Sequence, residues 1–137
     1  MLTLYLPLVT IHNYLRWIVL IILLFTLYRA YVGWVQNKSW SNLDDKLGLV
    51  FTSAMDTQFL LGLLVYGVLK FSVTPRILTE HIIPMIAAVI ITHIGRSRSK
   101  NASRDQSKHK QSAIWFSVSL LIVVLSIPWY RPLLRGL

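Results

Sequence analysis

Residues 10–34 read TIHNYLRWIVLIILLFTLYRAYVGW, and this stretch decides the fold class. Arg16 and Arg29 are its only charged side chains. A helix needs about 20 mostly apolar residues to cross the hydrocarbon core of a bilayer. The stretch therefore predicts a transmembrane helix.

Three further stretches have the length and hydropathy of a membrane span: about 47–69, about 77–95 and about 112–130. The alternating segments of about 10 residues that mark a membrane β-barrel do not occur. Connections of about 12 and about 7 residues join the first three spans, as antiparallel neighbours need. We therefore expect an all-α integral membrane protein, an antiparallel up-down four-helix bundle that forms a single transmembrane domain over residues 1–137.

The composition agrees with a membrane protein. Hydrophobic residues make up 55% of the 137 residues and charged residues 14%, whereas soluble domains have about 25% charged residues. The net charge of +9 is combined with a mean hydropathy of +0.58, which argues against a nucleic-acid-binding module. The absence of cysteine excludes disulfides, iron–sulfur clusters, thiolate zinc sites and cysteine nucleophiles.

Local motifs predict where several helices begin and end. Residues 41–44, Ser-Asn-Leu-Asp, form a capping box, so the second helix begins before its apolar stretch. Thr74 and Pro75 predict the start of the third helix. Pro84 is expected to bend that helix, and Pro128 and Pro132 to end the last one.

Residues 96–111 read RSRSKNASRDQSKHKQ and carry six basic residues against one acidic residue. We interpret this segment as a cytoplasmic loop that obeys the positive-inside rule and contacts anionic headgroups, in preference to a nucleic-acid-binding arm. Both termini are then on the outer side of a cell inner membrane, which the chain crosses several times. His109, within the loop, is expected to be solvated.

Ionisable side chains inside a bilayer are costly, so each one needs a physical reason. The candidates are His12, Arg16, Asp56, Glu80, His81 and His93, with Asn13 and Gln58 as neutral polar additions.

His12 and His81 are expected at similar depth, since both lie a few residues into a helix that starts on the same side. Two imidazoles that approach a flat ligand from opposite sides provide the bis-histidine ligation of a haem iron, and imidazole also binds several other metals. Arg16 lies one helical turn after His12. It could contact a haem propionate near the outer surface, pair with Asp56, or extend its charge to the interface.

The remaining polar side chains have weaker interpretations. Asp56, if unpaired, would be a proton-relay or quinone contact, and Glu80 would orient a neighbouring group or meet water at the interface. His93 follows His81 by 12 residues, so the two cannot bind one metal from the same helix.

A stripe of mostly small side chains follows His81 along the third helix. Such a stripe admits a flat ligand or, more commonly, a packed helix. Its members are His81, Met85, Ala88, Thr92 and Gly95.

Four strings carry a resemblance to a known family: HNYLRWIVL, LGLVFTSAMDTQFLLGLLVY, TEHIIPMIAAVIITHIGRSRSK and SIPWYRPL. They resemble small four-helix inner-membrane proteins of Bacteroidetes, largely uncharacterised and sometimes labelled cytochrome-b-like. The resemblance covers nearly the whole chain and implies a membrane haem protein in electron transfer, with His12 and the Glu80–His81 pair as matching positions. Relatives often have histidine where this chain has Asp56, so the resemblance implies that this chain has lost a haem if that histidine is a haem ligand in the relatives.

We therefore expect a membrane b-type haem protein, with the iron held between His12 and His81 and with Arg16 near the cofactor. Its partners would be the lipid bilayer, a quinone or respiratory protein, and further copies of the chain, but not nucleic acid. It would be an electron carrier or subunit rather than a stand-alone enzyme. Two alternatives remain open: a cofactor-free accessory or assembly subunit of a larger membrane complex, and a small transporter or channel subunit.

Overall fold

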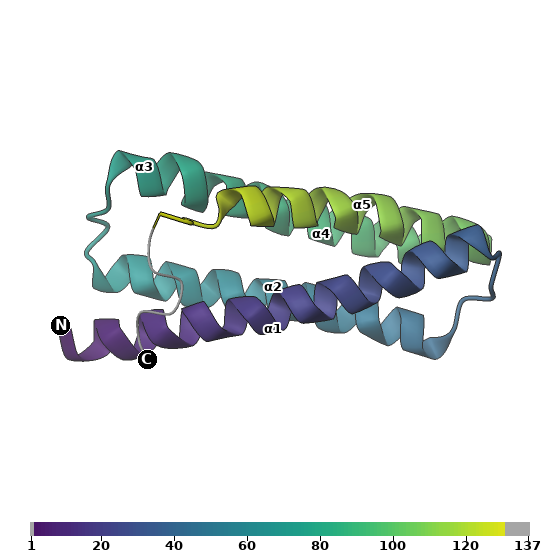
Figure 1. The fold of residues 1–137 in the computed structure, drawn as a ribbon, viewed down its shortest axis with the longest axis horizontal. Coiled ribbons are helices and arrows are strands. Elements are labelled where there is room, and N and C mark those ends of the chain that lie inside the picture. The colour runs from purple at the N-terminus through teal and green to yellow at the C-terminus, as the bar shows by residue number, and fades with distance from the viewer. Residues whose placement is uncertain (1, 131–137) are drawn as a thin grey trace.

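The computed structural model describes residues 2–130 and the side chains of residues 3–130. Its elements are α1 (Leu2–Val35), α2 (Asn42–Val68), α3 (Pro75–Ile77), the π-helical turn η1 (Leu78–Ile82), α4 (Ile83–Asn101) and α5 (Asp105–Ser126). The elements α3, η1 and α4 follow one another without a break and form the third span, so the bundle has four long helical rods (Figure 1). Neighbouring rods run antiparallel, as expected.

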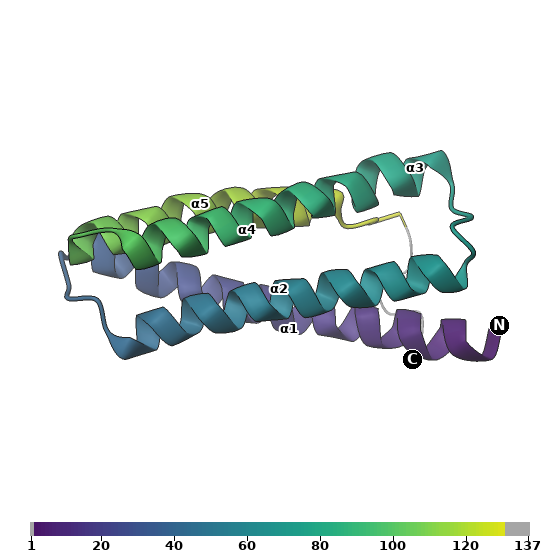
Figure 2. The ribbon, with the colours of Figure 1, turned by 180° about the vertical axis from the view of Figure 1, so that it is seen from behind.

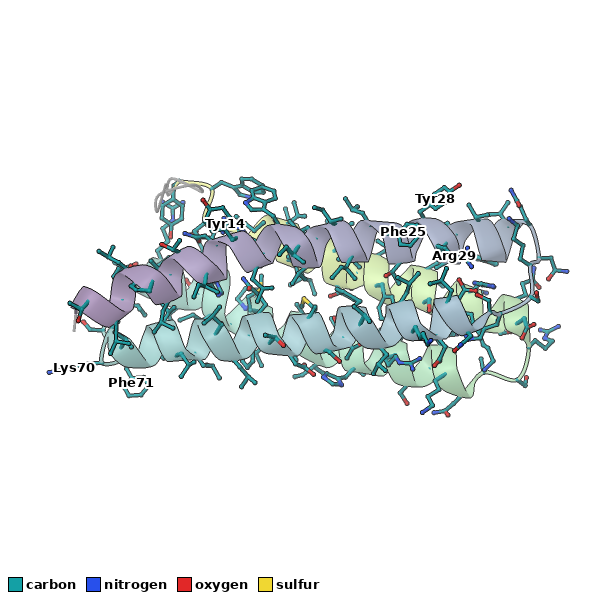
Figure 3. The ribbon with its side chains drawn as sticks, turned by 90° about the horizontal axis from the view of Figure 1, so that it is seen from below. Tyr14, Phe25, Tyr28, Arg29, Lys70 and Phe71 are labelled. Atoms are coloured by element: carbon teal, nitrogen blue, oxygen red, sulfur yellow. The ribbon has the colours of Figure 1, made fainter. Side chains whose placement is uncertain are left out.

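Each of the four rods is long and apolar enough to cross a membrane: Thr3–Val35, Asn42–Val68, Pro75–Asn101 and Asp105–Ser126. The chain is therefore an all-α, multi-pass membrane protein, and the expected four-helix architecture is confirmed. Much of the outer surface is apolar. Tyr28, for example, points away from α2 and is 65% exposed, whereas Arg29 lies between α1 and α2 (Figure 3). The side of the membrane on which the termini lie stays a prediction.

The centre of the bundle is held by aromatic packing and by a close approach of α4 to α5. The rings of Phe51 and Phe116 meet at 4.9 Å and 75°, and both side chains are fully buried. Gly95 lies against Trp115 and Phe116, where a Cβ atom would not fit. The small residues Ala88, Thr92 and Gly95 therefore accommodate a neighbouring helix, the more common of the two uses expected for this stripe.

All four rods are longer than the sequence analysis predicts. The first begins at Leu2 rather than near residue 10, and the third runs from Pro75 to Asn101 rather than from about 77 to 95. The apolar windows mark the part of a helix that lies in hydrocarbon, but hydrogen bonding continues into polar sequence until a residue stops it. The capping box at Ser41 is confirmed, since its Oγ accepts from the Asp44 amide and α2 begins at Asn42.

The expected basic loop at residues 96–111 is wrong. Only residues 102–104 separate α4 from α5, and the rest of the segment is helical. No glycine or proline occurs between residues 96 and 127, and lysine, arginine and glutamine are good helix formers. Arg96 also ties this part of α4 to α2, because its Nη1 lies 2.9 Å from Oδ1 of Asp45.

The last helix spans Asp105–Ser126 rather than residues 112–130. Ile127 has an extended conformation and Pro128 follows it, which confirms the predicted stop at Pro128. Pro132 lies outside the described residues.

The third span, which Pro84 is expected to bend, has a distorted turn just before the proline. The five residues of η1 form a π-helical turn, in which the amide of Ile83 donates to the carbonyl of Leu78. Pro84 has no amide hydrogen to continue a regular α-helical ladder from that turn. Single π turns inside α-helices are frequent at functional sites, and this one contains His81.

Candidate functional site

A cavity of about 670 Å³ lies between the helices towards the end at which α1 begins. This volume lies within the range of about 300–1,000 Å³ that is usual for small-molecule and cofactor sites. Most of its wall is aliphatic or aromatic. The polar or partly polar side chains are Tyr5, His12, Asn13, Arg16, Gln58, Tyr66, Ser72, Thr74 and His81.

The structure brings His12 and His81 together across this cavity. The two ring centroids are 6.2 Å apart and the ring planes are nearly perpendicular, at 88°. A bond from imidazole nitrogen to a metal is about 2 Å long, so two imidazoles on opposite sides of one metal have centroids about 6 Å apart. The predicted proximity of the two histidines is therefore confirmed, and their spacing fits a shared metal.

His81 is oriented by the last turn of α5. Its Nδ1 lies 2.8 Å from the carbonyl oxygen of Ser126. A carbonyl only accepts hydrogen bonds, so Nδ1 carries the hydrogen and a neutral ring keeps its lone pair on Nε2. Histidines that bind metals are commonly fixed through their other nitrogen in this way.

His12 is held by two residues of α2. Gln58 donates through Nε2 to the carbonyl oxygen of His12 at 2.9 Å, and the same amide nitrogen lies 3.4 Å from Nε2 of the ring. Gly62, one turn further along α2, leaves the space that the ring fills, because a Cβ there would lie 3.1 Å from Cε1 of His12.

Two buried polar atoms at this position lack hydrogen-bond partners among the described residues: Nδ1 of His12 and Oε1 of Gln58. Each such atom costs about 1–3 kcal/mol when it is buried without a partner. Both residues line the cavity, so the donor set is suited to a bound group that supplies what the chain does not.

Arg16 lies one turn deeper than His12 and also lines the cavity. It is only 7% exposed, and its guanidinium carbon lies 5.4 Å from the ring centroid of Trp17. A guanidinium that lines a cavity is suited to bind a carboxylate. Arg16 is thus buried within the bundle, and its contact with a haem propionate stays a prediction.

Asp56 does not join the cavity. Its Oδ1 lies 2.8 Å from Nε2 of His93, and the two side chains are 41% and 54% exposed on the outside of α2 and α4. The ion pair between Arg16 and Asp56 that the sequence left open does not form, and Asp56 instead lies within hydrogen-bond distance of His93. Glu80 likewise faces outward and pairs with Arg76 at 2.8 Å, so it does not orient His81.

The expectation that His109 is solvated is wrong. The residue is 1% exposed, and its ring packs on Trp40 at 4.9 Å and against Gly33. Because residues 105–111 are helical, α5 carries His109 inward towards α1. Nε2 of His109 lies 3.4 Å from the carbonyl oxygen of Ser39. His109 does not line the cavity between His12 and His81.

Sequence reasoning missed the contributions of Gly62 and of the Ser126 carbonyl. The spacing of Gln58 and Gly62, four residues apart on one helical face, is a signal that could have found the first. A backbone carbonyl has no sequence signal.

The site brings together two histidine side chains as nitrogen donors. Within residues 2–130 no group of three or more histidine, cysteine, aspartate or glutamate side chains could hold a metal ion. Zinc sites use three or four protein ligands, whereas haem needs at most two from the protein.

No protein-family model, curated protein or solved structure matches the chain.

Proposed function

We propose that the chain is a b-type haem protein of the cell inner membrane that transfers electrons. The observation that carries the proposal is the pairing of His12 and His81 across a cavity of about 670 Å³, with ring centroids 6.2 Å apart. The resemblance to small membrane proteins labelled cytochrome-b-like, which is an expectation from the sequence, implies the same function.

The chain's own residues would hold and shield the cofactor. His12 and His81 would hold the cofactor through ring nitrogens, and the carbonyl of Ser126 fixes the Nδ1 hydrogen of His81. Arg16 would bind a carboxylate of the cofactor, and the apolar wall would exclude water. Haem, when bound, supplies reversible one-electron chemistry.

The electron donor that fits best is a quinol. A cavity bounded mainly by apolar side chains within a membrane-spanning bundle is reached most readily by a partner dissolved in the same bilayer. We propose that electrons pass between such a quinol and a partner protein. Asp56, His93 and Glu80 take no part in this proposal, because they lie on the outside of the bundle.

The test is a visible absorption spectrum of the protein, expressed with ample haem and purified in mild detergent. A Soret band, with sharp α and β bands after reduction by dithionite, is the expected result. His12→Ala and His81→Ala should each abolish the low-spin spectrum, while His93→Ala, on the same rod as His81 but outside the cavity, should retain it.

A variant that fails to fold would also lose its colour, so a rescue experiment is needed. In His81→Gly, added imidazole should restore the low-spin bands, because the free ring can occupy the vacated ligand position. A well-folded wild-type protein that stays colourless would overturn the haem proposal. The cofactor-free accessory subunit would then be the better reading, with His12 and Gln58 serving to join α1 to α2.

A further inference from the structure

The pair of Asp56 and His93 lies where an unassociated membrane bundle should have only apolar side chains. Asp56 is near the middle of α2, and both residues are on the broad face formed by α2 and α4, the two helices in front in Figure 2. Their side chains are 41% and 54% exposed, so neither is covered by another part of residues 3–130.

Exposed aliphatic side chains lie one helical turn from each residue of this pair. Leu60 on α2 and Ile90 on α4 are 60% and 54% exposed. Aspartate and histidine are too short to carry their polar atoms from mid-span to the headgroups, as lysine and arginine can. Ionisable side chains within a membrane span almost always face a protein interior or a water-filled cavity, even when they pair with one another as these two do. The pair therefore indicates a surface that is covered by protein.

The α2–α4 face is complementary to a second copy of itself. Copies inserted in the same direction are related by a two-fold axis along the membrane normal, which brings together residues of equal depth. Asp56 and His93 touch, so they have equal depth, and the axis places the acid of one copy near the base of the other. A face with charges of only one sign would repel its copy.

The exposed side of α2 also permits close approach. Ser53 and Thr57 flank Asp56, are exposed, and lie four residues apart. Pairs of small residues at this spacing are common where membrane helices pack closely. Thr57 bonds its hydroxyl back to the Ser53 carbonyl at 2.8 Å, which leaves a smooth surface.

We propose that two copies of the chain associate through the α2–α4 face, with Asp56 and His93 of both copies joined at its centre. This proposal is independent of the haem site, because neither residue lines the cavity. In the dimer, hydrogen bonds among the Asp56 and His93 side chains of both copies would satisfy polar atoms that a single copy exposes on its surface.

Single cysteines provide a direct test, because the natural chain has none. Ser53→Cys and Thr57→Cys place a thiol on the proposed interface. Leu121→Cys on α5 and Ile21→Cys on α1, 60% and 66% exposed, are matched controls on the other side of the bundle. After oxidation in native membranes, the first two should yield a disulfide-linked dimer on a non-reducing gel, and the controls should not.

The second measurement removes the polar pair. The double variant D56L/H93L should lower the cross-linked fraction of Ser53→Cys by about tenfold, while its elution profile shows that it stays folded. Monomers at all four positions would overturn the proposal. So would equal cross-linking of the controls, or a Ser53→Cys adduct with a different protein in place of the dimer.

Discussion

Gly33 on α1 and His109 on α5 lie in such close contact that a Cβ atom on Gly33 would overlap the imidazole ring. His109 also packs against Trp40, and the centroids of the two rings are 4.9 Å apart. The missing side chain at Gly33 is thus what allows α1, α5 and the connection between α1 and α2 to meet at this end of the bundle.

The first prediction is that Gly33→Ala lowers the free energy of unfolding by about 1–3 kcal/mol, the usual cost of forcing extra volume into a packed site. Alanine is about 1 kcal/mol better than glycine in a helix interior, so the steric cost must exceed that gain. Denaturant titration in detergent micelles measures it. Gly67→Ala is the control, since a Cβ there meets nothing within 4 Å and should not destabilise.

The second prediction separates two neighbouring carboxylates that both pair with arginine. Asp44 is 4% exposed, binds Arg29 at 2.8 Å and closes the capping box with Ser41. Asp45 is 40% exposed and forms an ion pair with Arg96 at 2.9 Å. Asp44→Ala should cost about 2 kcal/mol or more, because a helix cap and a shielded charge partner are lost together. Asp45→Ala should cost about 1 kcal/mol at most. Equal losses would argue against the burial of Asp44 as the cause.

The third prediction concerns the hydroxyl pair that joins α4 to α5. Oγ1 of Thr92 and Oγ of Ser119 are 2.7 Å apart, and both side chains are fully buried. Hydrogen bonds between membrane helices contribute about 0.6 kcal/mol on average and about 1.7 at most. A double-mutant cycle with Thr92→Val and Ser119→Ala should give a coupling energy in this range. A coupling of zero would show that the two hydroxyls act independently, each through the Ala88 carbonyl that both can reach.

The sequence was sufficient to predict the four spans because hydrocarbon imposes one strong condition, a long apolar run. It was insufficient for the helix ends. Arg96 and the basic residues after it are unfavourable in lipid but favourable in a helix, and hydropathy reports only the first property. The same error made His109 a solvated loop residue, whereas the helical course of α5 turns it towards Gly33.

The candidate site was predictable where it depends on depth. His12 and His81 each lie a few residues into a predicted span that starts on the same side of the membrane. Their similar depth could therefore be predicted without knowing how the helices pack. The partner of Asp56 depends on the rotation of α2 and α4, which packing determines and one sequence does not. The role of Ser126 depends on where α5 ends, and its carbonyl carries no residue-specific signal.

The last prediction tests the site through Gly62, which touches His12 without being a ligand itself. A Cβ at Gly62 would lie 3.1 Å from Cε1 of His12, tighter than an ordinary van der Waals contact. The imidazole must then move away from α2 by a few tenths of an ångström, and its hydrogen bonding with Gln58 must change.

Residues that orient a metal-binding histidine typically change metal affinity by about 10–100-fold when they are replaced. Gly62→Ala should therefore lower haem affinity by about tenfold, measured by titration of the haem-free protein and followed at the Soret band. Gly67→Ala, on the same helix and in open space, should bind haem as the wild type does. If Gly62→Ala keeps the wild-type affinity while His12→Ala loses it, the His12 ring has room to adjust, and its position is not determined by the contact with α2. If Gly62→Ala and His12→Ala both bind haem as the wild type does, His12 is not a ligand. The proposal of a haem site between His12 and His81 is then wrong.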